Sequence, residues 1–409
     1  MMVTVHEAHR IIQHSLSTPI AEDAALGQIQ GRVLARDIMA PFSLPRFTNA
    51  AMDGFAVKWD DIQHASNDAP VILQVTQKIP AGKLSILAVA SGCCAEIMTG
   101  APLPEGTDTV VAFEQTSGFR SALVEIFKAP KLGANIRYRG EEVAEGKLLF
   151  CKGESVSPSH IAILASFGYA SAAVQKKPNV SIVTVGDELQ FPGEQVSGAQ
   201  IYNCNFFMLS AACRSIGIEP ISVRHVADDR KALREVLEHS LDHCDILITV
   251  GGISTGEYDF VQQELSLLGV QKKFWNISQK PGKPLYFAST ASGHPVFSLP
   301  GNPVSALVCF MEYCIPALCY LEGKSVPDKL RATLAESFPA DKKRHRFLPG
   351  KVWLDEGRLL CRVASGIESH MITSVNGSNC IIESDPSPEP LSAGIEVSCT
   401  LLPWANLFQ

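Results

Sequence analysis

The stretch DILITVGGISTGEYDFVQQELSLLG, residues 245–269, decides the fold of this chain. Its first part, DILITV, is a short apolar run typical of a buried strand, and it ends abruptly at Gly251 and Gly252. A helix pattern, DFVQQELSLLG, follows. A glycine-rich turn between a strand and a helix often holds phosphate, yet this turn also carries two carboxylates, Glu257 and Asp259. The stretch therefore predicts a strand–turn–helix unit whose ligand must suit both features.

The same alternation continues on both sides of this unit, over residues 177–325. Apolar strand patterns such as VSIVTV and HPVFSL alternate with helix patterns such as NCNFFMLSAACRSIG, DRKALREVLEHSL and PVSALVCFMEYCIPALCYLEG. This order predicts a three-layer α/β domain with a mainly parallel sheet covered by helices on both faces. In such domains ligands bind at the carboxyl ends of the strands.

The rest of the chain predicts β-rich modules around this domain. Residues 41–140 carry short β-like runs broken by turn residues, which indicates an inserted β-rich domain. Residues 1–40 and 141–176 flank the insertion and form a discontinuous N-terminal linker domain in this interpretation. Residues 326–409 again show short strands and indicate a small C-terminal β domain.

Composition excludes several classes of protein. The chain has 409 residues, of which 46% are hydrophobic and 19% charged, with a net charge of -7. The acidic balance argues against nonspecific nucleic-acid binding, and we expect no membrane span because no apolar run of about 18 residues stands out. The N-terminus lacks the pattern of a secretory signal. The 12 scattered cysteines contain no CxxC pair, which favours reduced core cysteines in a cytoplasmic protein.

Three further strand-end loops carry unusual chemistry. VGDEL places Glu188 after a strand, KPGKPL places Lys280 and Lys283 around a Pro-Gly turn, and SLPGNPVSALV starts a helix at Asn302 and Pro303. The lysines and the free N–H groups of that helix start, with Ser305 nearby, suit a phosphate. The carboxylates then suit Mg²⁺, a positioned water or ligand N–H groups. Taken alone, each loop is better explained by helix caps and turns, but four such loops on one predicted edge favour a functional site.

A second group of motifs lies in the β-rich part. PRFTNAAMDGFAV carries Asp53, IMTGAPLPEGTDTVV carries Thr99, and NIRYRGEEV carries Glu142. Taken alone, RYRGEE reads as a solvated charged turn. None of these motifs matches a Ser-His-Asp arrangement, a Walker loop or a GxGxxG fingerprint.

Taken together, seven motifs in one order resemble the molybdopterin molybdenumtransferases of the MoeA family. They are FTNAAMDGFAV, IMTGAPLPEGTDTVV, RYRGEE, VGDEL, VGGISTGEYDF, KPGKPL and SLPGNPVSALV, and the resemblance also covers the C-terminal SGIESHMITSVNGSNCIIE. It implies an enzyme that inserts molybdenum from molybdate into adenylylated molybdopterin and releases AMP, with Mg²⁺ as a cofactor. It also implies a homodimer, with the N-terminal linker domain as the dimerisation domain, and transient contact with other proteins of molybdenum cofactor biosynthesis.

The resemblance assigns roles to residues of the quoted motifs. The implied catalytic residues are Asp53, Thr99, Glu188, Asp228 and Asp259. The implied substrate-binding residues are Gly251, Gly252, Ser254, Lys280, Lys283, Pro300, Gly301, Asn302, Pro303 and Ser305. The implied metal ligands are Asp259 and Glu188, with Glu142 as a further candidate. Two positions depart from the family pattern: Ala50 replaces a common serine, and Glu142 replaces a common aspartate.

Two alternatives remain open at this level. A molybdopterin adenylyltransferase-like enzyme would need only the α/β domain, and a non-catalytic scaffold would resemble gephyrin. The sequence also leaves open whether the metal substrate is molybdate or tungstate, and whether AMP leaves before or after the metal is inserted.

Overall fold

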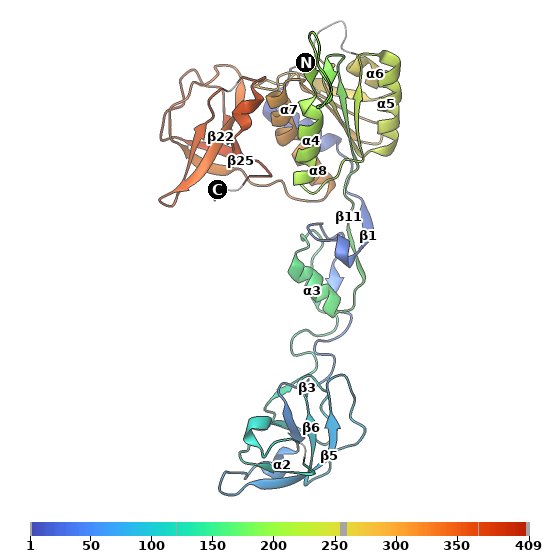
Figure 1. The fold of residues 1–409 in the computed structure, drawn as a ribbon, viewed down its shortest axis with the longest axis vertical. Helices are drawn as coiled ribbons and strands as arrows, with labels where there is room; N and C mark the ends of the chain where they lie inside the picture. Colours follow the sequence, from blue (N-terminus) through green and yellow to red (C-terminus); the bar gives the residue numbers. More distant parts are fainter. Residues whose placement is uncertain (1, 120, 254–259, 367, 406–409) are drawn as a thin grey trace. The chain divides into compact units, whose positions relative to one another are not determined.

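A computed structural model describes four stretches of the chain, residues 2–119, 121–253, 260–366 and 368–405 (Figure 1). It divides into two compact units: unit 1 comprises Met1–Ala35 and Ala172–Gln409, and unit 2 comprises Arg36–Ser171. The four-domain division expected from the sequence is finer than this one and stays a prediction.

A six-stranded sheet forms the centre of unit 1. Its strand order is β15 (Ser222–Val226), β12 (Val180–Val185), β16 (Ile246–Val250), β20 (Pro295–Leu299), β19 (Tyr286–Ser289) and β17 (Gln271–Trp275). The first four strands are parallel, whereas β19 pairs antiparallel with both of its neighbours, β20 and β17. Every residue of β12, β16 and β20 is buried, which explains their continuous apolar patterns. The mainly parallel sheet predicted from the sequence is confirmed, with an antiparallel edge added.

Helices cover both faces of this sheet (Figure 1). One face carries α4 (Cys204–Ser215), α7 (Pro303–Cys309) and α8 (Ile315–Leu321), and the other carries α5 (Arg230–His243) and α6 (Val261–Leu267). Successive side chains of a strand point to opposite faces, so Ile182 packs in one core with Leu209 of α4 while Val183 packs in another with Leu237 of α5. The N-terminal helix α1 (Val5–Ser15) adds Ala8 and Ile12 to the first core.

The segment Pro303–Leu321 is one continuous helical run. A π-helical turn, η3 (Phe310–Cys314), joins α7 to α8. Among the described residues this is the one helix long and apolar enough to cross a bilayer, with a mean hydropathy of 1.8. The expectation that no apolar run reached this length was therefore wrong. The helix is nevertheless 83% buried inside the protein, as a core helix is.

The C-terminal part of unit 1 forms a second sheet of six strands. They are β18 (Gln279–Lys280), β22 (His345–Asp355), β23 (Arg358–Val363), β21 (Leu330–Leu334), β25 (Glu396–Leu401) and β24 (Cys380–Ser384), in that order. Because β22 pairs with both β23 and β24, all of these strands except β18 close into a barrel. Leu348, Val352 and Ile382 lie in its core. The small C-terminal β module predicted from the sequence is present.

Unit 2 contains a five-stranded sheet. Its order is β7 (Thr109–Ala112), β4 (Gly54–Val57), β6 (Cys93–Ile97), β5 (Val71–Ile79) and β8 (Leu123–Ile126). Shorter elements complete the unit: β2 (Ile38–Met39), β3 (Asn49–Ala50), α2 (Trp59–Ile62), β9 (Ile136–Arg137), β10 (Leu148–Phe150) and α3 (Pro158–Ser166). Phe55 packs in one core of this sheet and Ala56 in another, so both faces of β4 are covered.

Gly54 permits the close approach of β4 to β7. A Cβ at this position would lie 1.9 Å from the carbonyl oxygen of Val111, which is backbone and cannot move aside. We expect Gly54→Ala to lower the free energy of unfolding of unit 2 by about 3 kcal/mol. Amide hydrogen exchange in β6 and β7 measures this loss. Gly27→Ala is the control because a Cβ there meets nothing within 4 Å. Equal protection in both variants would contradict the register of β4 and β7.

Candidate functional site

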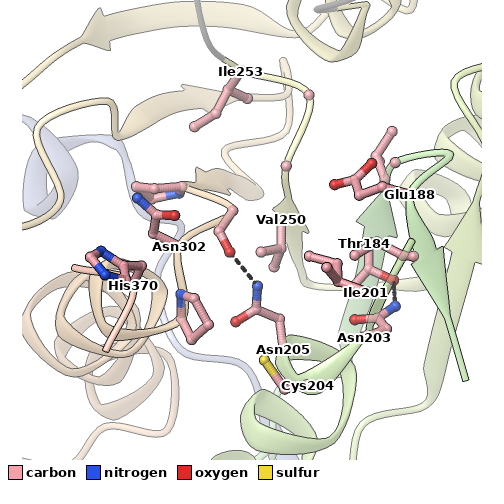
Figure 2. Close-up of a pocket in the computed structure, with 18 of the residues that line it drawn as sticks. Thr184, Glu188, Ile201, Asn203, Cys204, Asn205, Val250, Ile253, Asn302 and His370 are labelled. Carbon is pink, nitrogen blue, oxygen red and sulfur yellow. Dashed lines mark hydrogen bonds between the residues drawn. The ribbon is translucent and has the colours of Figure 1, made fainter. Parts of the chain in front are cut away.

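The carboxyl edge of the parallel strands borders a cavity of about 680 Å³ in unit 1 (Figure 2). This volume lies in the range of small-molecule sites, about 300–1,000 Å³. Figure 2 shows Glu188 and Ile201 on one side of Val250, and Asn302 and His370 on the other. The cavity therefore lies where the sequence predicted a ligand, at the ends of β12, β16 and β20.

Many of the residues that the motifs singled out line this cavity. They are Glu188, Asp228, Gly251, Gly252, Pro300, Gly301, Asn302 and Pro303. Within the described part of the chain, Lys280, Lys283 and Ser305 do not line it, although Pro284, next to Lys283, does. Ser254, Glu257 and Asp259 lie outside the described residues.

The two glycines after β16 are required by the packing of the turn itself. Gly251 has a φ of +88°, and a Cβ on it would lie 2.4 Å from the carbonyl oxygen of Val185. Gly252 has a φ of +62°, and its Cβ would lie 2.7 Å from a methyl group of Val261. The chain can therefore turn tightly over the end of β12 only with glycine at both positions. This turn brings the backbone itself to the wall of the cavity.

Two carboxylates line the cavity at the ends of β12 and β15. The loops that carry them are tied together: Asp187 donates its N–H to Asp228 Oδ2 at 3.3 Å, and Asp228 donates its N–H to Asp187 Oδ1 at 2.9 Å. Glu188 is exposed beside this pair. The described residues contain no cluster of three or more His, Cys, Asp or Glu side chains able to hold a metal. Glu188 and Asp228 fit Mg²⁺ nevertheless, because this ion is usually held by one or two carboxylates together with substrate phosphates.

The expected anion-binding groups are arranged differently from the prediction. Among the described lining residues there is no lysine or arginine. The backbone of Lys280 lies in β18, opposite Arg346 of the neighbouring strand β22. The side chain of Lys283 is exposed. At the start of α7 the N–H of Val304 donates to the carbonyl of Ser369 at 3.2 Å, and the side chain of Ser305 is buried. One N–H expected to be free is thus already bonded.

The start of α4 contributes lining residues that the sequence analysis missed. Asn203 caps this helix by accepting a hydrogen bond from the N–H of Phe206, and its amide donates to Thr184 Oγ1 at 2.8 Å. Asn205 donates its amide to the carbonyl of Gly301 at 2.7 Å, which joins α4 to the turn before α7 (Figure 2). The available signal was topological: α4 follows β12, so it must start at the same edge of the sheet.

In unit 2 the structure brings two predicted residues together. Thr99 donates both its N–H and its hydroxyl to Asp53 Oδ1, each at 2.7 Å. The N–H bond first, and the hydroxyl bond second, hold the pKa of Asp53 below its ordinary value. Glu142 lies exposed in the charged turn and donates its N–H to the carbonyl of Leu44 at 3.1 Å. Ala50 is fully buried, so a serine there would carry a buried hydroxyl.

Removal of the Thr99 hydroxyl separates these two contributions to the pKa of Asp53. We expect Thr99→Val to raise that pKa only part of the way to its ordinary value. The variant loses the hydroxyl bond, which is the smaller cause of the shift, and keeps the N–H bond, which is the larger one. A depressed carboxyl pKa stabilises the fold above the unfolded-state pKa, and this stability is lost as the pH falls through the folded-state pKa. Carbon-13 NMR titration of the Asp53 carboxyl measures the change. Thr107→Val, which removes a hydroxyl bonded to Pro104, should leave it unaltered.

Three family models match successive parts of the chain. Residues 3–168 match the MoeA N-terminal region (domain I and II), residues 181–319 a probable molybdopterin binding domain, and residues 331–402 the MoeA C-terminal region (domain IV). An adenylyltransferase-like enzyme needs only the central part, so the matches on both sides favour the molybdenumtransferase.

Curated relatives and solved structures agree with these models. The chain is 34% identical to Molybdopterin molybdenumtransferase 2 of Mycobacterium tuberculosis, over 85% of this chain and 87% of the relative. It is 31% identical to the Molybdopterin molybdenumtransferase of Haemophilus influenzae, over 99% of this chain and 100% of the relative. A structure of the molybdopterin biosynthesis MoeA protein of Pyrococcus horikoshii superposes with a TM-score of 0.82 at 30% identity, covering 98% of this chain and 99% of that one. The chain therefore belongs to the MoeA family, whose members are molybdopterin molybdenumtransferases of molybdenum cofactor biosynthesis.

Proposed function

We propose that the chain transfers molybdenum from molybdate to adenylylated molybdopterin, releases AMP, and binds this substrate in the cavity of unit 1. The observation that carries the proposal is that residues of the VGDEL, VGGI and SLPGNP segments meet around one cavity at the carboxyl edge of the sheet. Apart from His370 and Ile372, the residues that line this cavity lie within the part of the chain that matches a molybdopterin binding domain. Its size suits a nucleotide-like ligand.

Backbone groups contact the anionic part of the substrate in this proposal. Gly301 supports the idea, because a Cβ on it would meet only the Cα of Gly251, 4.0 Å away. The free protein therefore gives no steric reason for a glycine there, whereas a ligand that touches the backbone does. Lys283 is next in sequence to the lining residue Pro284, and in this proposal it and Lys280 add positive charge to the field that attracts the substrate.

Glu188 and Asp228 hold Mg²⁺ in this proposal, together with Asp259 from outside the described residues. When bound, Mg²⁺ neutralises charge on the phosphate link of the substrate. The hydrogen bonds between Asp187 and Asp228 keep the metal-binding loops in one arrangement before the ion arrives. Asp53 in unit 2 is kept charged by Thr99, and the resemblance of its motif to the family gives it a catalytic role in this proposal.

We further infer a homodimer in the cytoplasm, with transient contact with other proteins of molybdenum cofactor biosynthesis. The dimer and these contacts are inferred from the resemblance of the sequence motifs to those of the MoeA family. All 12 cysteines are free in the structure, which fits a reducing compartment.

The direct test of the proposed function is an assay of AMP release and molybdenum insertion with adenylylated molybdopterin, molybdate and Mg²⁺. The wild-type chain should perform both steps. Asp259→Asn should cut AMP release by about 100-fold while the oligomeric state stays the same, because it removes one charge from the metal site. Normal AMP release in this variant would refute the role of Asp259, and an inactive wild-type chain would refute the proposed reaction.

A second variant tests the metal site through the described residues. Glu188→Gln should raise the Mg²⁺ concentration for half-maximal AMP release by about tenfold, because an amide oxygen is a weaker ligand than a carboxylate. Mn²⁺ binding followed by electron paramagnetic resonance gives a readout that does not depend on turnover. Glu238→Gln, on the exposed face of α5, is the matched control. If both variants bind Mn²⁺ equally, Glu188 is not a metal ligand.

A further inference from the structure

The cavity has an apolar rim that the motifs do not explain. Ile201 and Tyr202 form the short strand β14 (Ile201–Tyr202), and both line the cavity. Ile201 is 56% exposed and Tyr202 is 47% exposed. Single exposed apolar side chains are common on protein surfaces. Here two consecutive exposed residues of one strand both line a ligand cavity, which is the expected position for a binding surface.

Hydrogen bonds hold Tyr202 in place at both ends. Its backbone belongs to a parallel ladder with β13 (Leu189–Gln190), and the flanking N–H of Asn203 donates to the carbonyl of Gln190 at 2.9 Å. Its hydroxyl donates to the carbonyl of Glu194 at 3.0 Å. A tyrosine fixed at both ends loses little conformational freedom when a ligand binds to it.

The same ladder fixes the distance between the apolar rim and the acids. The N–H of Ile201 donates to the carbonyl of Glu188 at 2.8 Å. The carboxylate proposed for the phosphate end of the substrate and the apolar pair therefore belong to one hydrogen-bonded ribbon. A substrate that reaches from one to the other would find both already in position.

An aromatic cluster supports this ribbon from α4. Phe191, directly after β13, packs edge-on against Phe206 with ring centroids 5.2 Å apart, and against Phe207 at 6.4 Å. It also packs against His225 of β15 at 6.0 Å. The ribbon is thus anchored to both α4 and the sheet, so its cavity side is a rigid surface.

We propose that Tyr202 is the platform on which a flat nitrogen heterocycle of the substrate stacks. This inference rests on the proposed function, whose substrate contains two such rings, adenine and the pterin. The described charged and amide groups of the lining serve the polar parts of such a substrate, whereas a flat heterocycle stacks on an aromatic face. Tyr202 thereby acts as a specificity-determining residue that binds the substrate away from the reacting atoms.

The test compares Tyr202→Ala, Tyr202→Leu and Tyr202→Phe in the full-length chain. Tyr202→Ala and Tyr202→Leu should raise KM for adenylylated molybdopterin by about tenfold, because they remove a stacking face, and should leave kcat within about twofold. Tyr202→Phe keeps the ring and should restore most of the affinity. Thermal unfolding checks that all three variants fold.

Direct binding of AMP, and competition by molybdopterin without a nucleotide, identify the ring. Weaker AMP binding by Tyr202→Ala places adenine on the platform, and weaker competition by molybdopterin places the pterin there. Either result supports the inference. Unaltered KM, AMP binding and molybdopterin competition in a folded, active Tyr202→Ala variant would overturn it. A wild-type chain without turnover would instead refute the proposed function.

Discussion

The burial of β16 between two parallel neighbours is the constraint on which the site depends. Its backbone is hydrogen-bonded to β12 on one side and to β20 on the other, and all its residues are buried. Polar chemistry can therefore occur only where these strands end, and parallel strands end at one edge. The same packing leaves so little room above Val185 that the chain must leave β16 through Gly251. Fold and cavity follow from one arrangement of strands.

Hydrogen bonds between loops turn this edge into a defined site. Asn205 joins α4 to the carbonyl of Gly301, and Asp187 joins the end of β12 to Asp228. These bonds connect elements that follow different strands, so the loops cannot move independently without losing them. A preformed site is valuable for a highly charged substrate, because groups already in place need no reorganisation when the charge arrives. The fixed positions of these loops therefore contribute to how well the cavity stabilises the charge of its substrate.

The sequence predicted the α/β core well because its signal is local. The apolar runs of β12, β16 and β20 are continuous, and the glycine and proline signals mark their ends. Nonlocal pairing was not visible: the backbone of Lys280 joins the C-terminal sheet opposite Arg346, and the N–H of Val304 donates to the carbonyl of Ser369. The lining role of Tyr202 was also missed, because a two-residue strand has no periodicity from which a side chain can be assigned to a cavity.

The two rims of the cavity differ in what they can contribute to catalysis. Contacts to a distant ring are the same before and during bond breaking at the phosphate. A platform at Tyr202 therefore stabilises the bound substrate and the transition state equally. Charge on the phosphate link changes as the bond breaks, so the groups around Glu188 and Asp228 can distinguish the two states. The β13–β14 ribbon joins both rims in one rigid element. The ring contact therefore sets how much substrate occupies the cavity at a given concentration, and the acids set how fast the phosphate link of the bound substrate breaks.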